Sequence, residues 1–326
     1  MMNEQYSTLP PQDGDQPLES GSYYFSSRGP SLDGYLPDIC APGGSIAPIP
    51  RHSLQGKAQY HGTSMSSPNA AGVAACILSA VKQQGMNCNP VELKRALINT
   101  ATPIGIIDSF AQGNGVVQAS NCVDYIMATH GKGGQNIEFE VSLPSRNNAR
   151  GLYIRDESEL FGPLTFGVLV KPKFSHSNQR TDSEMEELLN LNLNLKLKAS
   201  KTWVICPDQI TILSAQDRGG QSFSIRLKVE DLEHGVHFAT VDAIDDDDLS
   251  RGSLFSVPVT VIIPHHSSAG EDYSTTFQLT QGRPDRRFLT VPLGAEWATV
   301  KLTGNSKKDA LAAPRILVHA GKSVFI

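Results

Sequence analysis

The spacing of the hydrophobic residues changes near residue 131, and this change constrains the fold more than any other feature of the sequence. Up to about Met127 these residues recur with the period of a helix, about 3.6, whereas beyond Gly131 they alternate with a period of 2. Helices and strands bring different residues to one face, so a single kind of element cannot satisfy both patterns. One helical stripe consists of Ala70, Val73, Ala74, Ile77, Leu78 and Val81. The sequence therefore predicts an α/β region followed by an all-β region.

Local signals place a second helix after residue 89. Asn89 suits an N-cap, Pro90 suits the first helical position, and Glu92 stands three residues after the cap. We expect the buried face of this helix to contain Leu93, Ala96 and Leu97.

Alternating segments separated by turn residues predict a β-sandwich in the second half of the chain. In residues 188–198 leucine alternates with asparagine or lysine, which favours a strand with one solvated face over a low-complexity segment. The alternating sets are Ile137/Phe139/Val141/Leu143, Leu164/Phe166/Val168/Val170, Leu189/Leu191/Leu193/Leu195/Leu197, Phe223/Ile225/Leu227/Val229 and Phe255/Val257/Val259/Val261/Ile263.

Composition excludes several classes of function. The chain has 326 residues and a net charge of −5 without a basic cluster, so we expect no nucleic-acid partner. Its longest run of small apolar residues, 71–81, is too short to span a membrane, and its polar N-terminus lacks the layout of a secretory signal. The cysteines, odd in number and irregularly spaced, fit reduced thiols in a cytosol-like compartment.

The acidic run Asp245–Asp248 admits two interpretations. Four carboxylates in a row can bind a cation, but the run lacks the ligand spacing of a calcium loop. A solvated turn is the favoured interpretation.

The segment that points most directly to chemistry is Gly62-Thr63-Ser64-Met65-Ser66-Ser67-Pro68, immediately before the first helical stripe. A serine at a helix N-terminus has free backbone N–H groups and the positive end of the helix dipole beside it, which can stabilise an oxyanion formed by attack of its hydroxyl. The alternative is that Thr63 or Ser64 only caps the helix, with Pro68 in its first turn. The segment is not the nucleophile elbow of α/β-hydrolases, because Ser66 stands where that motif requires glycine.

This segment resembles the nucleophile segment of subtilisin-like serine proteases. Ser26–Pro30, Pro37–Gly44 and Gly113–Ala119 resemble other segments of that family in the same order. The resemblance implies a partial subtilisin-like α/β domain with a parallel sheet. It also implies that Ser64 is the nucleophile and that its backbone N–H is an oxyanion donor. It implies no cofactor and no metal.

A narrower resemblance, to the tripeptidyl-peptidase II family, covers about residues 20–326. The segments around Ser64, 111–115, 147–156, 203–207 and 286–297 carry it. It implies a cytoplasmic serine exopeptidase that removes tripeptides from peptides with free N-termini and assembles into a large homo-oligomer. It also divides the chain into an unmatched, disordered stretch (1–20), the C-terminal part of a peptidase domain (21–130), a β-sandwich (131–266) and the start of a further β-rich domain (267–326).

The base and the acid that such a serine requires have no good candidates before Ser64. The histidines there are His52, in a loop without the expected glycine-rich surroundings, and His61, which stands where the family usually has asparagine and fits a loop histidine better. The aspartates are Asp13, Asp15, Asp33 and Asp38, and no asparagine offers the side-chain oxyanion donor. We therefore expect a fragment that contributes Ser64 but is inactive alone. A non-catalytic scaffold is the alternative, and a ligand-binding sandwich has only fold-level analogy behind it.

Overall fold

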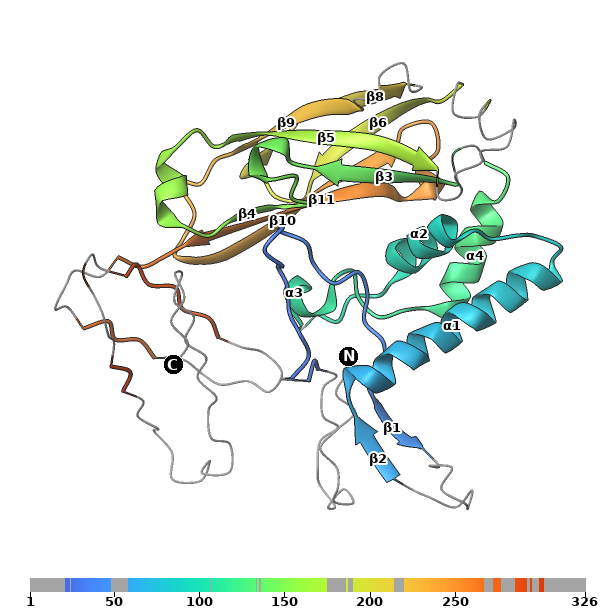
Figure 1. Ribbon diagram of the computed structural model, residues 1–326, viewed down its shortest axis with the longest axis horizontal. Helices are drawn as coiled ribbons and strands as arrows, with labels where there is room; N and C mark the ends of the chain where they lie inside the picture. Colours follow the sequence, from blue (N-terminus) through green and yellow to red (C-terminus); the bar gives the residue numbers. More distant parts are fainter. Residues whose placement is uncertain are drawn as a thin grey trace.

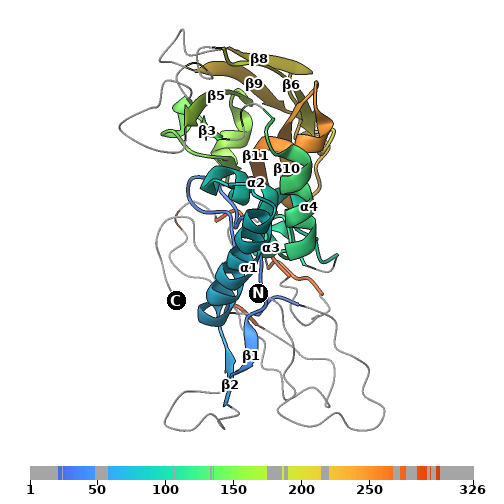
Figure 2. The ribbon, with the colours of Figure 1, turned by 90° about the vertical axis from the view of Figure 1, so that its right-hand side faces the viewer.

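The computed structural model describes residues 21–301 except 24, 48–57, 106, 133, 135, 175–185, 187–189, 214–219, 267–271, 277–284, 292–293 and 295–298. The chain forms two regions. A region of helices and loops comes first in the sequence, and a β-sandwich follows and packs against it (Figures 1 and 2). The disorder expected in 1–20 and most of the β-rich domain expected in 267–326 lie outside the described residues.

The helical region contains a hairpin of β1 (Gly44–Ala47) and β2 (Ala58–His61), followed by α1 (Thr63–Gln83), α2 (Pro90–Thr100), α3 (Ser109–Gln112) and α4 (Ala119–Thr129). Asn89 caps α2 as predicted, since its side chain accepts from the Glu92 amide at 2.9 Å. Among the described residues, the expected parallel sheet is present as a bridge between Cys40 and Val116.

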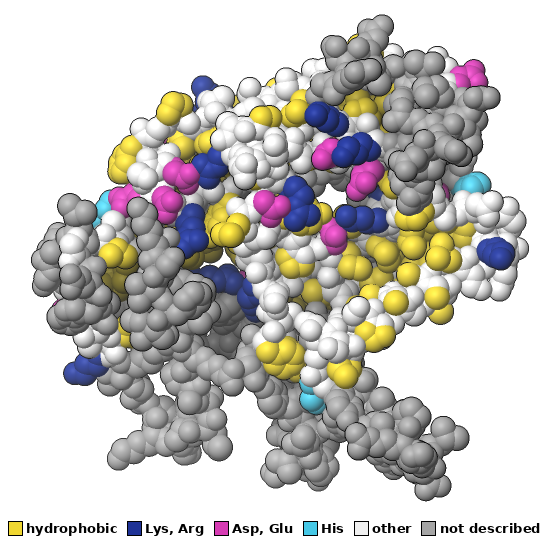
Figure 3. All heavy atoms as spheres, viewed as in Figure 1, with side chains coloured by type: hydrophobic (Ala, Val, Ile, Leu, Met, Phe, Trp, Pro, Cys, Tyr) yellow, Lys and Arg dark blue, Asp and Glu magenta, His cyan; other side chains and the backbone are white. Residues whose placement is uncertain are grey.

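The stripe on α1 is helical, but its burial is less than expected. Ile77 and Val81 are buried against α4, whereas Leu78 is 39% exposed and Ala71 and Cys76 are also exposed. Hydrophobic side chains line this part of the surface in Figure 3. The helical period identified residues that share one face of α1. Among the described residues, only the part of that face at Ile77 and Val81 is buried by a neighbouring helix.

The predicted sandwich is present as two sheets. One has the order β4-β11-β10-β6-β8 and the other β3-β5-β9-β7, and all pairs are antiparallel except β4 with β11. The strands are β3 (Ile137–Ser142), β4 (Leu152–Ile154), β5 (Thr165–Phe174), β6 (Asn192–Ala199), β7 (Val204–Ile205), β8 (Gln209–Leu213), β9 (Gln221–Leu227), β10 (Gly235–Asp245) and β11 (Ser253–Ile263), with the short helices η1 (Pro144–Arg146), η2 (Glu157–Phe161) and η3 (Leu249–Arg251) between them.

Alternation predicted the inward faces of β3, β5, β6 and β9, whereas β11 is buried on both faces and no alternating set was predicted for β4, β7, β8 and β10. In β6, Leu195 and Leu197 are buried while Asn194, Lys196 and Lys198 face solvent. Inward-facing residues of both sheets form one core, as sandwich packing requires.

The interpretation of the acidic run as a solvated turn is wrong for its first residue. Asp245 is 4% exposed and pairs with buried Arg251 at 2.6 Å, while Asp248 pairs with Lys132 at 2.6 Å. The 3-10 turn of η3 brings Arg251 back to Asp245. The run therefore takes part in packing and in charge pairs, and no group of three or more metal-ligating side chains occurs in the described part of the chain.

Candidate active site

Ser64 is the second residue of α1, and its side chain is exposed. The helix begins after Gly62, whose carbonyl accepts from the amides of Met65 at 3.0 Å and Ser66 at 3.2 Å. No side chain caps this end, so the interpretation of Thr63 or Ser64 as a side-chain N-cap is wrong. Within the described residues the Ser64 hydroxyl has no hydrogen-bond partner. The first amides of a helix lack intrahelical acceptors, so those of Thr63 and Ser64 are available to an anion.

Two hydrogen bonds fix the turn that carries Ser64. The amide of Gly62 donates to the carbonyl of Gly43 at 2.8 Å, and the hydroxyl of Ser66 donates to the carbonyl of Ala41 at 2.7 Å. Both acceptors belong to the segment 37–44 singled out in the sequence. The turn and that segment therefore move as a unit.

A pocket of about 240 Å³ lies beside the first turn of α1. Three of the segments noted in the sequence meet in its wall, contributing Ser26 and Ser27, then Cys40 and Ala41, then Thr63, Ser66 and Ser67. The fourth segment lies behind them, because Cys40 donates to the carbonyl of Gly115 at 2.7 Å and accepts from the amide of Val117 at 3.0 Å. The structure thus brings together all four segments that the sequence analysis noted separately.

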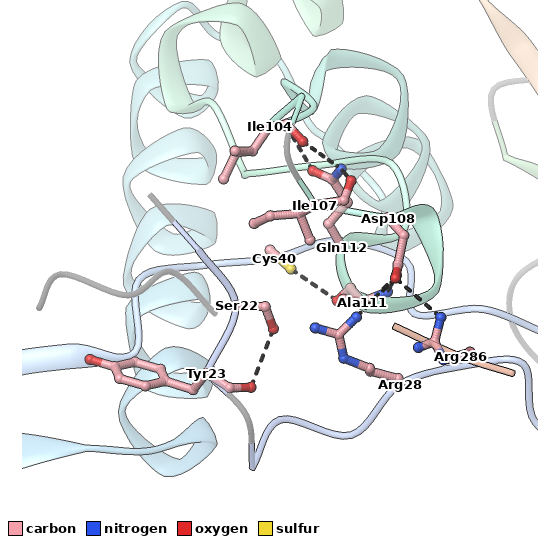
Figure 4. A network of polar contacts seen from close by, with 10 residues as sticks. All are labelled: Ser22, Tyr23, Arg28, Cys40, Ile104, Ile107, Asp108, Ala111, Gln112 and Arg286. Carbon is pink, nitrogen blue, oxygen red and sulfur yellow. Dashed lines mark hydrogen bonds and ion pairs between the residues drawn. The ribbon is translucent and has the colours of Figure 1, made fainter. Parts of the chain in front are cut away.

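A charged cluster supports the wall of this pocket, and sequence reasoning missed it (Figure 4). Asp108 accepts from the Ala111 amide at the start of α3, from Arg28 at 3.0 Å and from Arg286 at 3.2 Å. Burial lowers the pKa of Arg28, and Asp108 opposes that change. The guanidinium of Arg286 also lies over the ring of Phe110, 5.5 Å from its centre. A local pattern reveals only the cap at Asp108, since Arg286 is 178 residues away in the chain.

None of the described residues forms a base and acid for Ser64. His61 ends β2, where its exposed ring shares a 3.0 Å hydrogen bond between Nδ1 and the hydroxyl of Tyr23. Asp33 pairs with Arg150 at 2.6 Å, and Asp38 pairs with Lys94 at 3.6 Å and accepts from the hydroxyl of Tyr35. His52, Asp13 and Asp15 lie outside the described residues.

Three of the five cysteines are poor candidates for a nucleophile. All five are free. Burial raises the pKa of Cys88 to about 12 and also raises the pKa values of Cys122 and Cys206, so these thiols stay protonated near neutral pH.

Two family profiles match the chain in the order of its two regions. The profile of the subtilase family matches residues 15–118, which include Ser64 and the pocket. The profile described as tripeptidyl-peptidase II, first Ig-like domain, matches residues 137–262, which form the sandwich. Over these two regions, the chain is similar to the tripeptidyl-peptidase II family of subtilases.

Individual relatives agree with this similarity. Tripeptidyl-peptidase 2 of Arabidopsis thaliana is 33% identical over 89% of this chain and 21% of its own length, and that of Drosophila melanogaster is 30% identical over 94% of this chain and 21% of its own length. A crystal structure of tripeptidyl peptidase 2 superposes with a TM-score of 0.60 at 30% identity, covering 75% of this chain and 18% of that one. The chain spans about a fifth of the length of the curated relatives it matches.

None of the described helices combines the length and the hydrophobicity required to cross a bilayer.

Proposed function

We propose that this chain is part of a serine peptidase in which the hydroxyl of Ser64 attacks the scissile carbonyl and the backbone N–H of Ser64 stabilises the resulting oxyanion. The observation that carries the proposal is the position of Ser64, exposed at the second residue of a 21-residue helix, with a hydroxyl that no described residue engages. The free amides and the positive end of the helix dipole are then next to the reacting carbonyl. The match to the subtilase family over 15–118 supports the same role.

We further propose that the base, its orienting acid and the side-chain oxyanion donor lie outside these 326 residues. Of the described residues before Ser64, His61 forms no hydrogen bond with the Ser64 hydroxyl, and Asp33 and Asp38 are paired with cations. An unactivated serine hydroxyl is a weak nucleophile, and losing triad members lowers rates by about 10⁴- to 10⁶-fold. The chain alone is therefore expected not to hydrolyse peptides.

A complementation experiment tests this role. The chain is mixed with the separately produced N-terminal catalytic segment of the Drosophila relative and treated with a fluorophosphonate probe. We expect labelling of Ser64 in the mixture and not in either component. Ser64→Ala should abolish the label, whereas Ser67→Ala, which changes another exposed serine of the same helix end, should keep it. A stable complex that stays unlabelled would contradict the proposal.

The finer activity rests on the family. We propose that the assembled enzyme releases tripeptides from peptides with free N-termini, acts in the cytoplasm and forms a large homo-oligomer. Mass spectrometry of products from a free and an N-acetylated peptide checks the first point, because only the free peptide should yield tripeptides. Light scattering checks the assembly. The boundaries 1–20, 21–130, 131–266 and 267–326 remain part of this proposal, and the subtilase match from residue 15 favours an earlier start of the peptidase region.

The competing function is a non-catalytic scaffold in which the sandwich supplies assembly contacts. The charge pairs of Asp33 and Asp38 favour it, since they leave no unpaired aspartate among the described residues before Ser64. It predicts a soluble complex with the N-terminal segment in which Ser64 remains unlabelled.

A further inference from the structure

Tyr23 and His61 form a contact at the base of α1 that the proposed reaction does not use. Their hydroxyl and Nδ1 atoms are 3.0 Å apart, and their ring centres are 5.7 Å apart. Tyr23 is only 4% exposed, and its ring stacks on Phe25 with centres 4.9 Å apart. A buried tyrosine held in this way has little freedom, so it fixes the partner of its hydroxyl.

The backbone facing the pair is at Gly44, where there is no space for a side chain. Gly44 lies opposite His61 in the pairing of β1 with β2. A methyl group on Gly44 would lie 2.7 Å from the hydroxyl of Tyr23 and 3.2 Å from Nδ1 of His61. Any side chain at residue 44 would therefore displace the bonded atoms.

His61 is connected directly to the turn that carries Ser64. The next residue, Gly62, donates its N–H to Gly43 and accepts at its carbonyl from Met65 and Ser66. A shift of His61 changes the position of Gly62, and with it the first turn of the helix.

We propose that Tyr23 and His61 are positioning residues, which hold the Gly62–Ser64 turn so that the Ser64 hydroxyl and amide face the substrate carbonyl. Positioning, and not proton transfer, is the role assigned to His61, because no hydrogen bond joins it to the Ser64 hydroxyl among the described residues. The asparagine that the family usually has at this position reaches about as far as Nδ1 of histidine, so the same bond is available to it. This proposal rests on the proposed role of Ser64.

The first test needs only the chain itself and does not depend on catalysis. Hydrogen exchange at the amides of Gly62, Met65 and Ser66 is measured in the wild type and in Tyr23→Phe. Loss of one hydrogen bond should accelerate exchange there by about five- to tenfold. Tyr153→Phe is the control, since Tyr153 lies in β4 of the sandwich, away from this turn. It should leave these three amides unchanged.

Two substitutions of His61 distinguish the effect of the hydrogen bond at Nδ1 from the effect of side-chain size. The terminal group of asparagine lies near the place of Nδ1, whereas that of glutamine lies near the place of Nε2. His61→Asn should therefore exchange like the wild type, and His61→Gln should exchange like Tyr23→Phe. Gly44→Ala should behave like Tyr23→Phe, because its methyl group displaces the hydroxyl of Tyr23. If Tyr23→Phe and His61→Gln both match the wild type while the sandwich remains folded, the pair does not hold the turn and the proposal is wrong.

The second test uses the complemented mixture. Tyr23→Phe should lower the maximal rate of fluorophosphonate labelling about fivefold without changing the probe concentration that gives half that rate, and His61→Asn should label at the rate of the wild type. Equal maximal rates in Tyr23→Phe and the wild type would overturn the positioning role. If even the wild type fails to label, the proposed function fails, while the exchange rates still show whether the pair holds the turn.

Discussion

The β-sandwich and the helical region cover their hydrophobic residues by different means. The inner faces of the two sheets cover each other, and among the described residues 24 buried hydrophobic side chains form their common core. In the helical region five buried residues form the corresponding cluster, and α1 contributes only Ile77 and Val81 to it. Two sheets that pack face to face bury each other's hydrophobic residues. A long helix with hydrophobic residues on more than one side needs neighbouring elements on each of those sides to bury them.

Several polar contacts join the helical region to the sandwich. Arg95 of α2 donates to the carbonyl of Ile137, where β3 begins, at 2.6 Å. Asn99 donates to the carbonyls of Arg251 and Ser253, and the hydroxyl of Tyr125 also donates to the carbonyl of Arg251. The turn around Arg251 is therefore the point at which the stability of the helical region depends on the sandwich.

Removing the buried ion pair at this turn should lower the free energy of unfolding more than any other change proposed below. Arg251→Ala leaves Asp245 buried without its cation, and removing one partner of a buried pair costs about 3–5 kcal/mol. We expect the helical signal at 222 nm and the fluorescence of Trp203, measured in a Trp297→Phe background, both to shift to lower denaturant. The exposed pair of Lys173 and Glu140 gives the control, since Lys173→Ala should change stability by less than about 1 kcal/mol. A shift in the helical signal alone would show that the sandwich does not need this pair.

Truncating one buried side chain in the sandwich and one exposed side chain on α1 tests directly whether the two regions differ in how well their hydrophobic residues are covered. Ile225 in β9 is fully buried, and Ile225→Ala should destabilise the sandwich by about 2–5 kcal/mol. Leu78→Ala on the uncovered face of α1 should change stability by about 0.5 kcal/mol or less. Chemical denaturation followed by Trp203 fluorescence and by the helical signal measures both. A large loss in Leu78→Ala would mean that this face is covered in solution.

The sequence predicted the sandwich better than the helical region, for a physical reason. Strict alternation specifies which side of a strand is buried, so the wet face of β6 followed from its lysines and asparagines. The helical stripe on α1 identified a common face, but the exposure of Leu78 depends on a neighbouring layer that no local pattern describes.

The candidate site shows the same limit. Short motifs with local geometry, such as Ser64 before a helix and the cap at Asn89, were found from the sequence. The pairs of Asp108 with Arg286 and of Tyr23 with His61 join distant segments, so no spacing could reveal them. The burial of Asp245 was missed because a run of acidic residues predicts solvation unless a cation is known to fold back on it.

The smallest predicted effect concerns Glu92, whose side chain is 3% exposed in the otherwise weakly covered helical region. Burial raises the pKa of this carboxyl above its ordinary value of 4.5, and its Oε1 lacks a hydrogen-bond partner among the described residues. A raised pKa in the folded state means that the stability contributed by the protonated form is complete below the ordinary value and is lost as the pH rises through the raised value.

Glutamine at position 92 has nearly the shape of glutamate and keeps a side-chain oxygen that can accept a hydrogen bond, but it cannot ionise, so Glu92→Gln isolates the effect of the charge. It should therefore stabilise the helical region at pH 8 by on the order of 1 kcal/mol or less, and by much less at pH 4. Denaturation followed at 222 nm at both pH values checks this, with Glu138→Gln on the exposed side of β3 as the control. An equal gain at both pH values would mean that the missing hydrogen bond, and not the buried charge, is what limits stability at this position.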